Sequence, residues 1–146
     1  MRRNILLSFV FHILILVITS FLYSMGNHPA FLLAILIIAL SAYVTLGYAF
    51  LTPLTSNLLN FFSVSLVSLL GLLIGLYCLA FPSQMGFNWM LFLGYNLYVI
   101  GLGQVLHFDP SPSNTIWFFA VPSFGLWIGL QLKKKKNKNI HIIGNK

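Results

Sequence analysis

Charged residues are scarce in this sequence. They make up 6% of its 146 residues, whereas 59% of the residues are hydrophobic. A soluble domain has about 25% charged residues. Asp109 is the single acidic residue, and there is no glutamate. A soluble fold of this size could not cover such a chain with polar surface, so the composition predicts an integral membrane protein whose main solvent is lipid.

Reactive side chains are equally scarce. Ion-coupled transporters usually hold their ion or proton on a buried carboxylate or between charged pairs, and the chain has no lysine or arginine between Asn4 and Leu132. It contains no HExxH, no CxxC, no phosphate-binding glycine loop, and no serine with a base at helical spacing. The single cysteine, Cys78, can form no internal disulfide. We therefore expect no enzymatic activity and no bound cofactor.

The basic residues gather at the two ends of the chain. Arg2 and Arg3 open it, and five lysines fall within residues 133–138, just after the last apolar run. Basic residues beside apolar spans mark the cytoplasmic side and can contact anionic lipid headgroups. No folded basic surface is expected that could bind nucleic acid. The lysines predict a cytoplasmic C-terminal tail.

Breaks at glycine, proline and asparagine divide the apolar sequence into five runs. Each run is close to the roughly 20 residues that cross a bilayer as a helix. The predicted spans are residues 5–24, 30–51, 57–81, 88–107 and 114–132. Because the connections are only a few residues long, consecutive spans should be antiparallel neighbours. We expect an all-α polytopic transmembrane helix bundle in a single domain, residues 1–132, followed by a basic tail, residues 133–146.

The number of crossings has an alternative. Five spans place the two basic ends on opposite sides of the membrane, which conflicts with the rule that positive charge stays inside. Pro122 should kink or split the fifth run, and the fourth contains Asn96 and Gln104. If one of these two runs is re-entrant or interfacial, four spans leave both ends inside. We prefer five spans, and we expect the first run to be an uncleaved span because its apolar region is too long for a signal peptide.

Small residues are expected where the helices pack, because close packing replaces the hydrophobic effect inside lipid. Two glycine pairs have the GxxxG spacing: Gly71 with Gly75, and Gly125 with Gly129. The pattern is common in apolar helices. We therefore interpret these glycines first as contacts within the bundle, and second as a face for a membrane partner.

Two histidines are the main candidates for chemistry, since an ionisable residue inside a membrane is a functional hypothesis by default. His12 lies in the first run, and His107 ends the fourth, followed by Asp109. If the first four runs all cross, the two histidines lie toward the same face and could ligate haem or a metal ion. The alternative, which we prefer, is a neutral His12 hydrogen-bonded to a neighbouring helix.

Two amides in the fourth run are weaker candidates. Asn96 and Gln104 are roughly 80° apart on a helix and could line a polar cavity with Gly103. They could equally form interhelical hydrogen bonds, which are worth about 0.6–2 kcal/mol in membranes. We favour the packing interpretation.

These observations predict a non-enzymatic function. The first hypothesis is an accessory, immunity-like or regulatory subunit that packs against another membrane protein or against itself. The alternative is a small oligomeric transporter or channel for an uncharged or lipid-like substrate. The third is a redox subunit that binds haem or a metal ion through His12 and His107. The lysine, asparagine and isoleucine bias of the tail indicates a bacterial source, so we expect a multi-pass protein of a bacterial plasma membrane.

Overall fold

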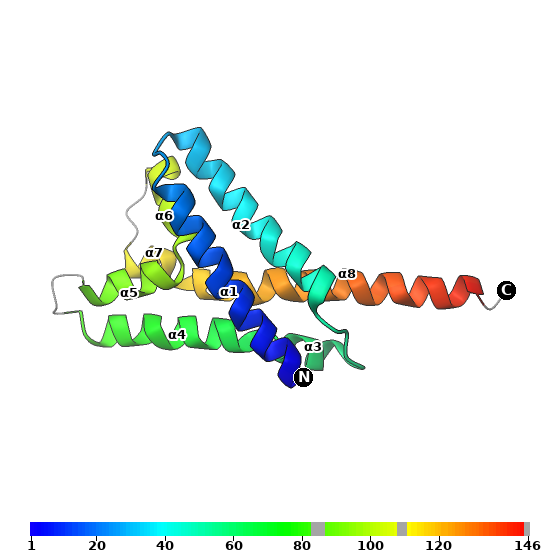
Figure 1. Ribbon diagram of the computed structural model, residues 1–146. Helices are drawn as coiled ribbons and strands as arrows, with labels where there is room; N and C mark the ends of the chain where they lie inside the picture. The colour runs from blue at the N-terminus through cyan, green and yellow to red at the C-terminus, as the bar shows by residue number, and fades with distance from the viewer. Residues whose placement is uncertain (83–86, 108–110, 145–146) are drawn as a thin grey trace.

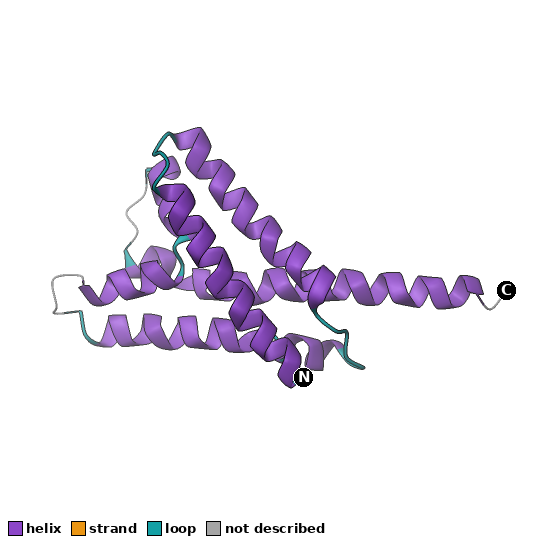
Figure 2. Cartoon of the chain, in the orientation of Figure 1, coloured by secondary structure: helices purple, strands orange, loops and turns teal. Residues whose placement is uncertain are grey.

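The structure, a computed structural model, describes residues 1–82, 87–107 and 111–144. Every regular element in these ranges is a helix, and the loops between helices are short (Figure 2). In chain order the helices are α1 (Arg2–Tyr23), α2 (Pro29–Phe50), α3 (Asn57–Phe62), α4 (Ser65–Ala80), α5 (Phe87–Tyr95), α6 (Tyr98–Leu106), α7 (Pro112–Thr115), the 3₁₀ helix η1 (Ile116–Ala120) and α8 (Val121–Gly144). The predicted all-α class is confirmed.

Three of the described helical segments are long and apolar enough to cross a membrane. They are α1, α2, and the segment Ile116–Lys138, which joins η1 to α8. The start of α2 agrees with the sequence. Pro29 is its first residue, where the missing N–H costs nothing, and the His28 side chain accepts a hydrogen bond from the Ala30 N–H. The first predicted span is also a single helix, α1, whereas the third, fourth and fifth predicted spans are interrupted or change helix type.

The predicted third span is divided into α3 and α4. Ser63 and Val64 lie between them, and the Val64 carbonyl accepts a hydrogen bond of 2.7 Å from Ser123 Oγ of α8. Ser123 Oγ in turn accepts a hydrogen bond of 3.2 Å from the Ser68 N–H in the first turn of α4. A side chain distant in sequence thus satisfies backbone groups that the break leaves free. With its 16 residues, α4 is about 24 Å long.

The predicted fourth span is a bent pair of short helices. The helix axes of α5 and α6 differ in direction by 100°. At the bend, Asn96 Nδ2 donates to the Phe92 carbonyl at 3.1 Å, the local side-chain bond that competes with regular helix. The Tyr23 hydroxyl of α1 donates to the Tyr98 carbonyl and accepts from the Gly101 N–H. The bend therefore satisfies its backbone with side chains.

Pro122 was expected to kink or split the fifth run, and the helix type does change there. The 3₁₀ helix η1 ends at Ala120, and Pro122 is the second residue of α8, a position that tolerates its missing N–H. From there α8 continues to Gly144, beyond the other helices (Figure 1). The predicted tail is thus helical as far as Gly144, because residues 123–143 include no proline to stop it.

The packing centres on α2 and α8, which make the most extensive contact in the described structure. In Figure 1, α1 and α2 form an inclined pair, and α1 passes across α8 and α4. Helix α6 packs against α2, while α5 and η1 pack against α4. The core cluster of buried apolar side chains includes Tyr43, Leu51, Tyr98, Phe118, Leu126 and Leu130.

Helix α1 turns several polar side chains inward and large apolar side chains outward. Polar residues of α1, including Asn4, Ser8 and Thr19, are buried. On its outer face Leu6 and Phe21 are each about two-thirds exposed. Exposed apolar surface of this extent needs an apolar solvent or a partner. The structure therefore fits a bilayer, with the polar side chains turned inward.

Both basic segments meet at one end of the molecule. Arg3 Nη2 donates to the Phe50 carbonyl at 3.2 Å, and Lys133 Nζ donates to the Leu51 carbonyl at 2.9 Å. Next to them, Asn4 pairs with the Thr52 backbone, donating at 2.8 Å and accepting at 3.1 Å. The start of α1, the end of α2 and the lysines of α8 are therefore neighbours, as Figure 1 also shows.

Candidate functional site

A buried polar cluster lies where α1, α2 and α5 meet. His12 Nδ1 and the Tyr43 hydroxyl share a hydrogen bond of 2.8 Å, and both residues are fully buried. The Tyr95 ring covers the imidazole, with 4.4 Å between ring centroids. The backbone of Tyr95 lies close to the imidazole, yet no described atom reaches His12 Nε2 with hydrogen-bond geometry. One buried nitrogen of the cluster is thus left without a described partner.

Tyr95 and one further tyrosine, Tyr98, connect this cluster to the bend. The Tyr95 hydroxyl donates to the Val67 carbonyl of α4 at 2.8 Å. The Tyr98 hydroxyl lies 3.2 Å from both Asn96 Oδ1 and the Phe118 carbonyl oxygen of η1. Together with the His12–Tyr43 pair, these bonds involve six helices, α1, α2, α4, α5, α6 and η1, so the cluster fixes the bend relative to the long helices. In low dielectric, each such bond is also costly to lose.

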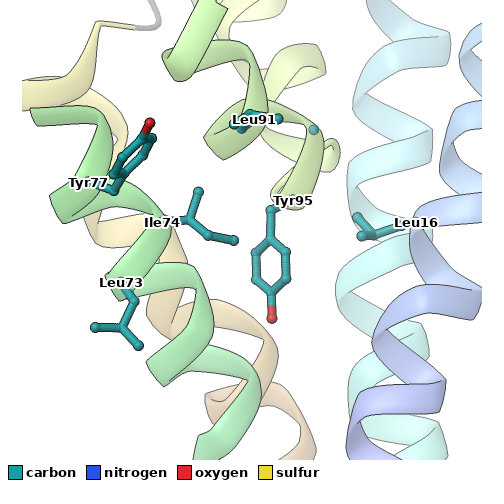
Figure 3. A pocket seen from close by; sticks show the side chains of 7 residues that line it. Leu16, Leu73, Ile74, Tyr77, Leu91 and Tyr95 are labelled. Carbon is teal, nitrogen blue, oxygen red and sulfur yellow. The ribbon is translucent and has the colours of Figure 1, made fainter. Parts of the chain in front are cut away.

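An apolar pocket of about 550 Å³ lies beside this cluster. It is lined by residues of three helices: Leu16 of α1, Leu73, Ile74 and Tyr77 of α4, and Leu91, Gly94 and Tyr95 of α5. Figure 3 shows Tyr95 between α4 and α1, with Leu16 on the opposite wall from Ile74. Tyr95 thus belongs to both the pocket and the polar cluster.

The pocket is open to the surface of the molecule. Its lining residues Leu73, Tyr77 and Leu91 are each about half exposed. A Cβ atom added to Gly94 would meet nothing within 4 Å, so this glycine faces open space. Leu16 is near the middle of α1. The opening therefore lies well within the length of the long helices.

The structure does not bring the two predicted histidine ligands together. His107 is exposed at the end of α6, in the left-handed conformation with φ 53°. Because α5–α6 bends, α6 runs beside the C-terminal end of α1, where Gly101 bonds to Tyr23. His12 lies eleven residues before Tyr23, about 16 Å along the helix axis. Asp109, the other predicted polar candidate, lies outside the described residues.

The two predicted amides have different surroundings. Asn96 is fully buried at the bend and bonds to its own chain, while Gln104 is exposed on α6. Gly103 between them is buried. Asn96 holds the bend through Phe92 and Tyr98, which is a packing role.

The glycine pairs lie against other helices of the same chain. The four positions are Gly71, Gly75, Gly125 and Gly129. A Cβ added to Gly71 would lie 3.0 Å from the Tyr95 ring, and one added to Gly75 would lie 3.0 Å from the Phe92 ring. A Cβ on Gly125 would lie 2.7 Å from Tyr43 Cβ. These glycines therefore allow helices of the same chain to pack closely together, and they do not lie on a free face.

The sequence analysis did not select the tyrosines of this site. Aromatic side chains near the ends of membrane spans are usually interfacial, because amphipathic rings prefer the membrane surface. Tyr43, however, lies in the middle of the run 30–51, where an interfacial role does not apply. That position was a usable signal. For Tyr95 and Tyr98, the signal was their place on either side of Asn96.

Comparison with known proteins adds no relative. No family model matches the chain, and no curated protein or solved structure matches it. The function is therefore argued from the geometry of the pocket and the bend.

Proposed function

We propose that the protein binds the hydrocarbon chain of an uncharged, lipid-like molecule in the pocket between α1, α4 and α5, as a small lipid-handling membrane protein. The observation that carries the proposal is a 550 Å³ apolar pocket beside a broken helix. Non-helical backbone at membrane depth is tolerated where protein buries it or where it lines a cavity. Asn96 is buried at the bend, and Tyr95 lines the pocket.

The lining explains the class of ligand. It is aliphatic and aromatic, and the hydroxyl groups of Tyr77 and Tyr95 are its only side-chain polar groups. The Tyr95 hydroxyl already bonds to Val67. The volume falls within the range of ligand sites, roughly 300–1,000 Å³. Because moving a chain from lipid into this pocket gains no hydrophobic free energy, selectivity comes from shape and close packing.

Filling the pocket tests the proposal. Gly94→Trp places an indole in the open space, whereas Gly94→Ala adds one methyl group at the same position and leaves most of the volume free. The probe is a phosphatidylcholine with a diazirine on one acyl chain, photolysed in vesicles that contain the protein. We expect labelling of residues 91–95 to fall at least several-fold in Gly94→Trp and to persist in Gly94→Ala.

The outer face of α1 supplies the reference, since Leu14 and Val17 are exposed and do not line the pocket. Labelling there should not change in either variant. Leu73→Trp, from the opposite wall of the pocket, is the second filling variant. Equal labelling of residues 91–95 in the wild type and both tryptophan variants, with the helical circular dichroism spectrum intact, would contradict the proposal.

The membrane arrangement that supports this function has four crossings. In it, α1, α2, α4 and η1–α8 cross, while α5–α6 enters and leaves by one face. Three observations support it. Arg3 and Lys133 both donate hydrogen bonds to carbonyls at the end of α2, and the axes of α5 and α6 differ in direction by 100°. Both basic ends are then cytoplasmic, in agreement with the positive-inside rule.

Reporter fusions test this arrangement. A reporter placed before Met1 and another placed after Lys146 should both show cytoplasmic activity. A third reporter inserted after Gly26, in the α1–α2 loop, should show external activity and serves as the control. Opposite sides for the two ends would refute the arrangement and restore five crossings.

A second candidate function is packing against a membrane partner, which we propose as self-association through α2. A shallow hollow of about 400 Å³ on its outer face is lined by Leu40, Ser41, Val44 and Thr45. Small and hydroxylated residues of this kind permit close helix approach. With Cys78→Ser as background, Ser41→Cys should form disulfide dimers in membranes, and Leu14→Cys on α1 should not. Monomer alone from Ser41→Cys would exclude this interface.

A further inference from the structure

The end of the molecule where the two basic segments meet contains two sets of cations. The inner set, Arg3, Lys133 and Lys134, is bound to the protein. Lys133 Nζ donates to the carbonyls of both Ala49 and Leu51 at 2.9 Å. These carbonyls end α2, where the helix dipole is negative. The inner set is therefore occupied in holding the end of α2 and the loop after it.

Lys134 and Arg3 complete this inner set. Lys134 Nζ donates to the Thr55 carbonyl and to Asn57 Oδ1, both at 3.0 Å. Arg3 donates to the Phe50 carbonyl, as described above. Each of the three inner cations thus has oxygen partners from the protein itself.

The outer set, Arg2, Lys135 and Lys138, has no such partners. All three side chains are exposed, and within residues 1–82, 87–107 and 111–144 none makes a hydrogen bond or ion pair. The neighbouring Lys136 lies over the Tyr48 ring, 5.9 Å from its centroid. Because Asp109 is the chain's single acidic side chain, the outer set has almost no internal counter-charge available.

Apolar side chains lie at the same end. In α3, Leu58 is 64% exposed and Phe62 is 50% exposed, while Asn60 is buried and accepts from the Leu54 N–H at 2.7 Å. The Phe61 ring packs edge-on against Trp127 of α8, one and a half turns before the first lysine. This short helix therefore turns apolar groups outward beside unpaired cations. That combination is typical of a surface in contact with the membrane interface.

We infer that the outer set binds the phosphodiester groups of anionic phospholipids, with the exposed side chains of α3 among the adjoining acyl chains. The unpaired cations complement the negative charge of these headgroups, and the exposed apolar side chains of α3 suit acyl chains and not nucleic acid. The cations of the outer set are free to reach a headgroup because the inner set already caps α2. The short helix α3 lies at the N-terminal end of α4, whereas the pocket lies along its C-terminal half, so the two sites are separate.

Lipid selectivity tests the inference. The full chain is reconstituted in vesicles of equimolar phosphatidylglycerol and phosphatidylcholine, extracted in mild detergent, and the retained lipids are counted by native mass spectrometry. We expect the wild type to retain phosphatidylglycerol preferentially. Removing both outer lysines, Lys135→Gln with Lys138→Gln, should lower that preference, by up to about fivefold for each charge near the surface. The matched pair Lys135→Arg with Lys138→Arg keeps the charge and should keep the preference.

Two results would overturn the inference. One is equal retention of the two lipids by the wild type. The other is an unchanged preference in the glutamine pair. Because glutamine has almost the helix propensity of lysine and both sites are exposed, the glutamine pair should fold, and its melting curve checks this. Lys134→Gln is the inner-set comparison: it should lower thermal stability while leaving most of the lipid preference.

Discussion

Replacing Gly129 by alanine should separate α2 from α8. A Cβ atom at this position would lie 2.6 Å from the Tyr48 nitrogen and would collide with the Val44 carbonyl oxygen. Both are backbone atoms of α2, so no rotamer change can relieve the contact. The helices would have to move apart, which weakens the most extensive contact in the described structure. Overpacking of this kind costs about 1–3 kcal/mol.

The same substitution at Gly94 supplies the control. There a Cβ atom would meet nothing within 4 Å. Alanine exceeds glycine in helix propensity by about 1 kcal/mol in a helix interior. This gain opposes the steric cost at Gly129 inside α8, and it is smaller at Gly94, the penultimate residue of α5. The difference between Gly129→Ala and Gly94→Ala is therefore a lower limit on the steric cost. We expect Gly129→Ala to be less stable by about 1–3 kcal/mol.

In the assay, the purified protein in mixed micelles is titrated with a denaturing detergent, and its unfolding is followed by circular dichroism. Gly94→Ala should be at least as stable as the wild type, and Gly129→Ala should unfold at a lower detergent fraction. If Gly129→Ala and Gly94→Ala unfold together, the close approach of α2 and α8 at Gly129 is wrong.

Two other predictions concern hydrogen bonds between distant segments. Asn4→Ala removes both bonds to the Thr52 backbone and should lower the free energy of unfolding by about 1–3 kcal/mol in the same titration; wild-type stability would mean that the amide does not hold the α2–α3 loop. Tyr23→Phe keeps the ring but removes the hydroxyl that bonds Tyr98 and Gly101. It should speed hydrogen exchange at the Gly101 amide while leaving exchange of the α2 amides unchanged. Unaltered exchange at Gly101 would show that the Tyr23 hydroxyl does not hold α6 against α1.

Helix boundaries marked by local signals could be predicted from the sequence. The start of α2 at Pro29 and its end at Phe50 agree with the predicted run to within one residue, because Pro29 and Pro53 act on their own backbone. Pro122 likewise marks the start of α8. Such signals need no information from elsewhere in the chain.

The breaks inside the third and fourth runs needed more than the local sequence. Val64 lies between two helices where Ser123, 59 residues away, binds its carbonyl. At the bend, Asn96 and Gly101 were visible as polar and small residues, but such residues also occur in straight helices. What fixes the bend is the set of partners from other helices, among them Tyr23 and the Phe118 carbonyl.

The candidate site was predicted only in part. His12 was selected because an ionisable residue in an apolar run is rare, and its hydrogen bond to a neighbouring helix was the preferred interpretation. The pairing partner, Tyr43, and the pocket beside Tyr95 were not selected. A pocket is the space that packing leaves between helices, and no single residue encodes it.

The sequence by itself determined the helical class of this protein, the apolar runs that could span a membrane and the places where charge could lie. Preferences for lipid or water and for helix are properties of individual residues that add along the chain. Only the tertiary structure decided that α5 and α6 bend, that both basic segments meet, and that an apolar pocket lies beside His12 and Tyr95. These features depend on bonds and contacts between groups that are distant in sequence. Their formation depends on which helices become neighbours, and that is settled by the packing of the whole chain.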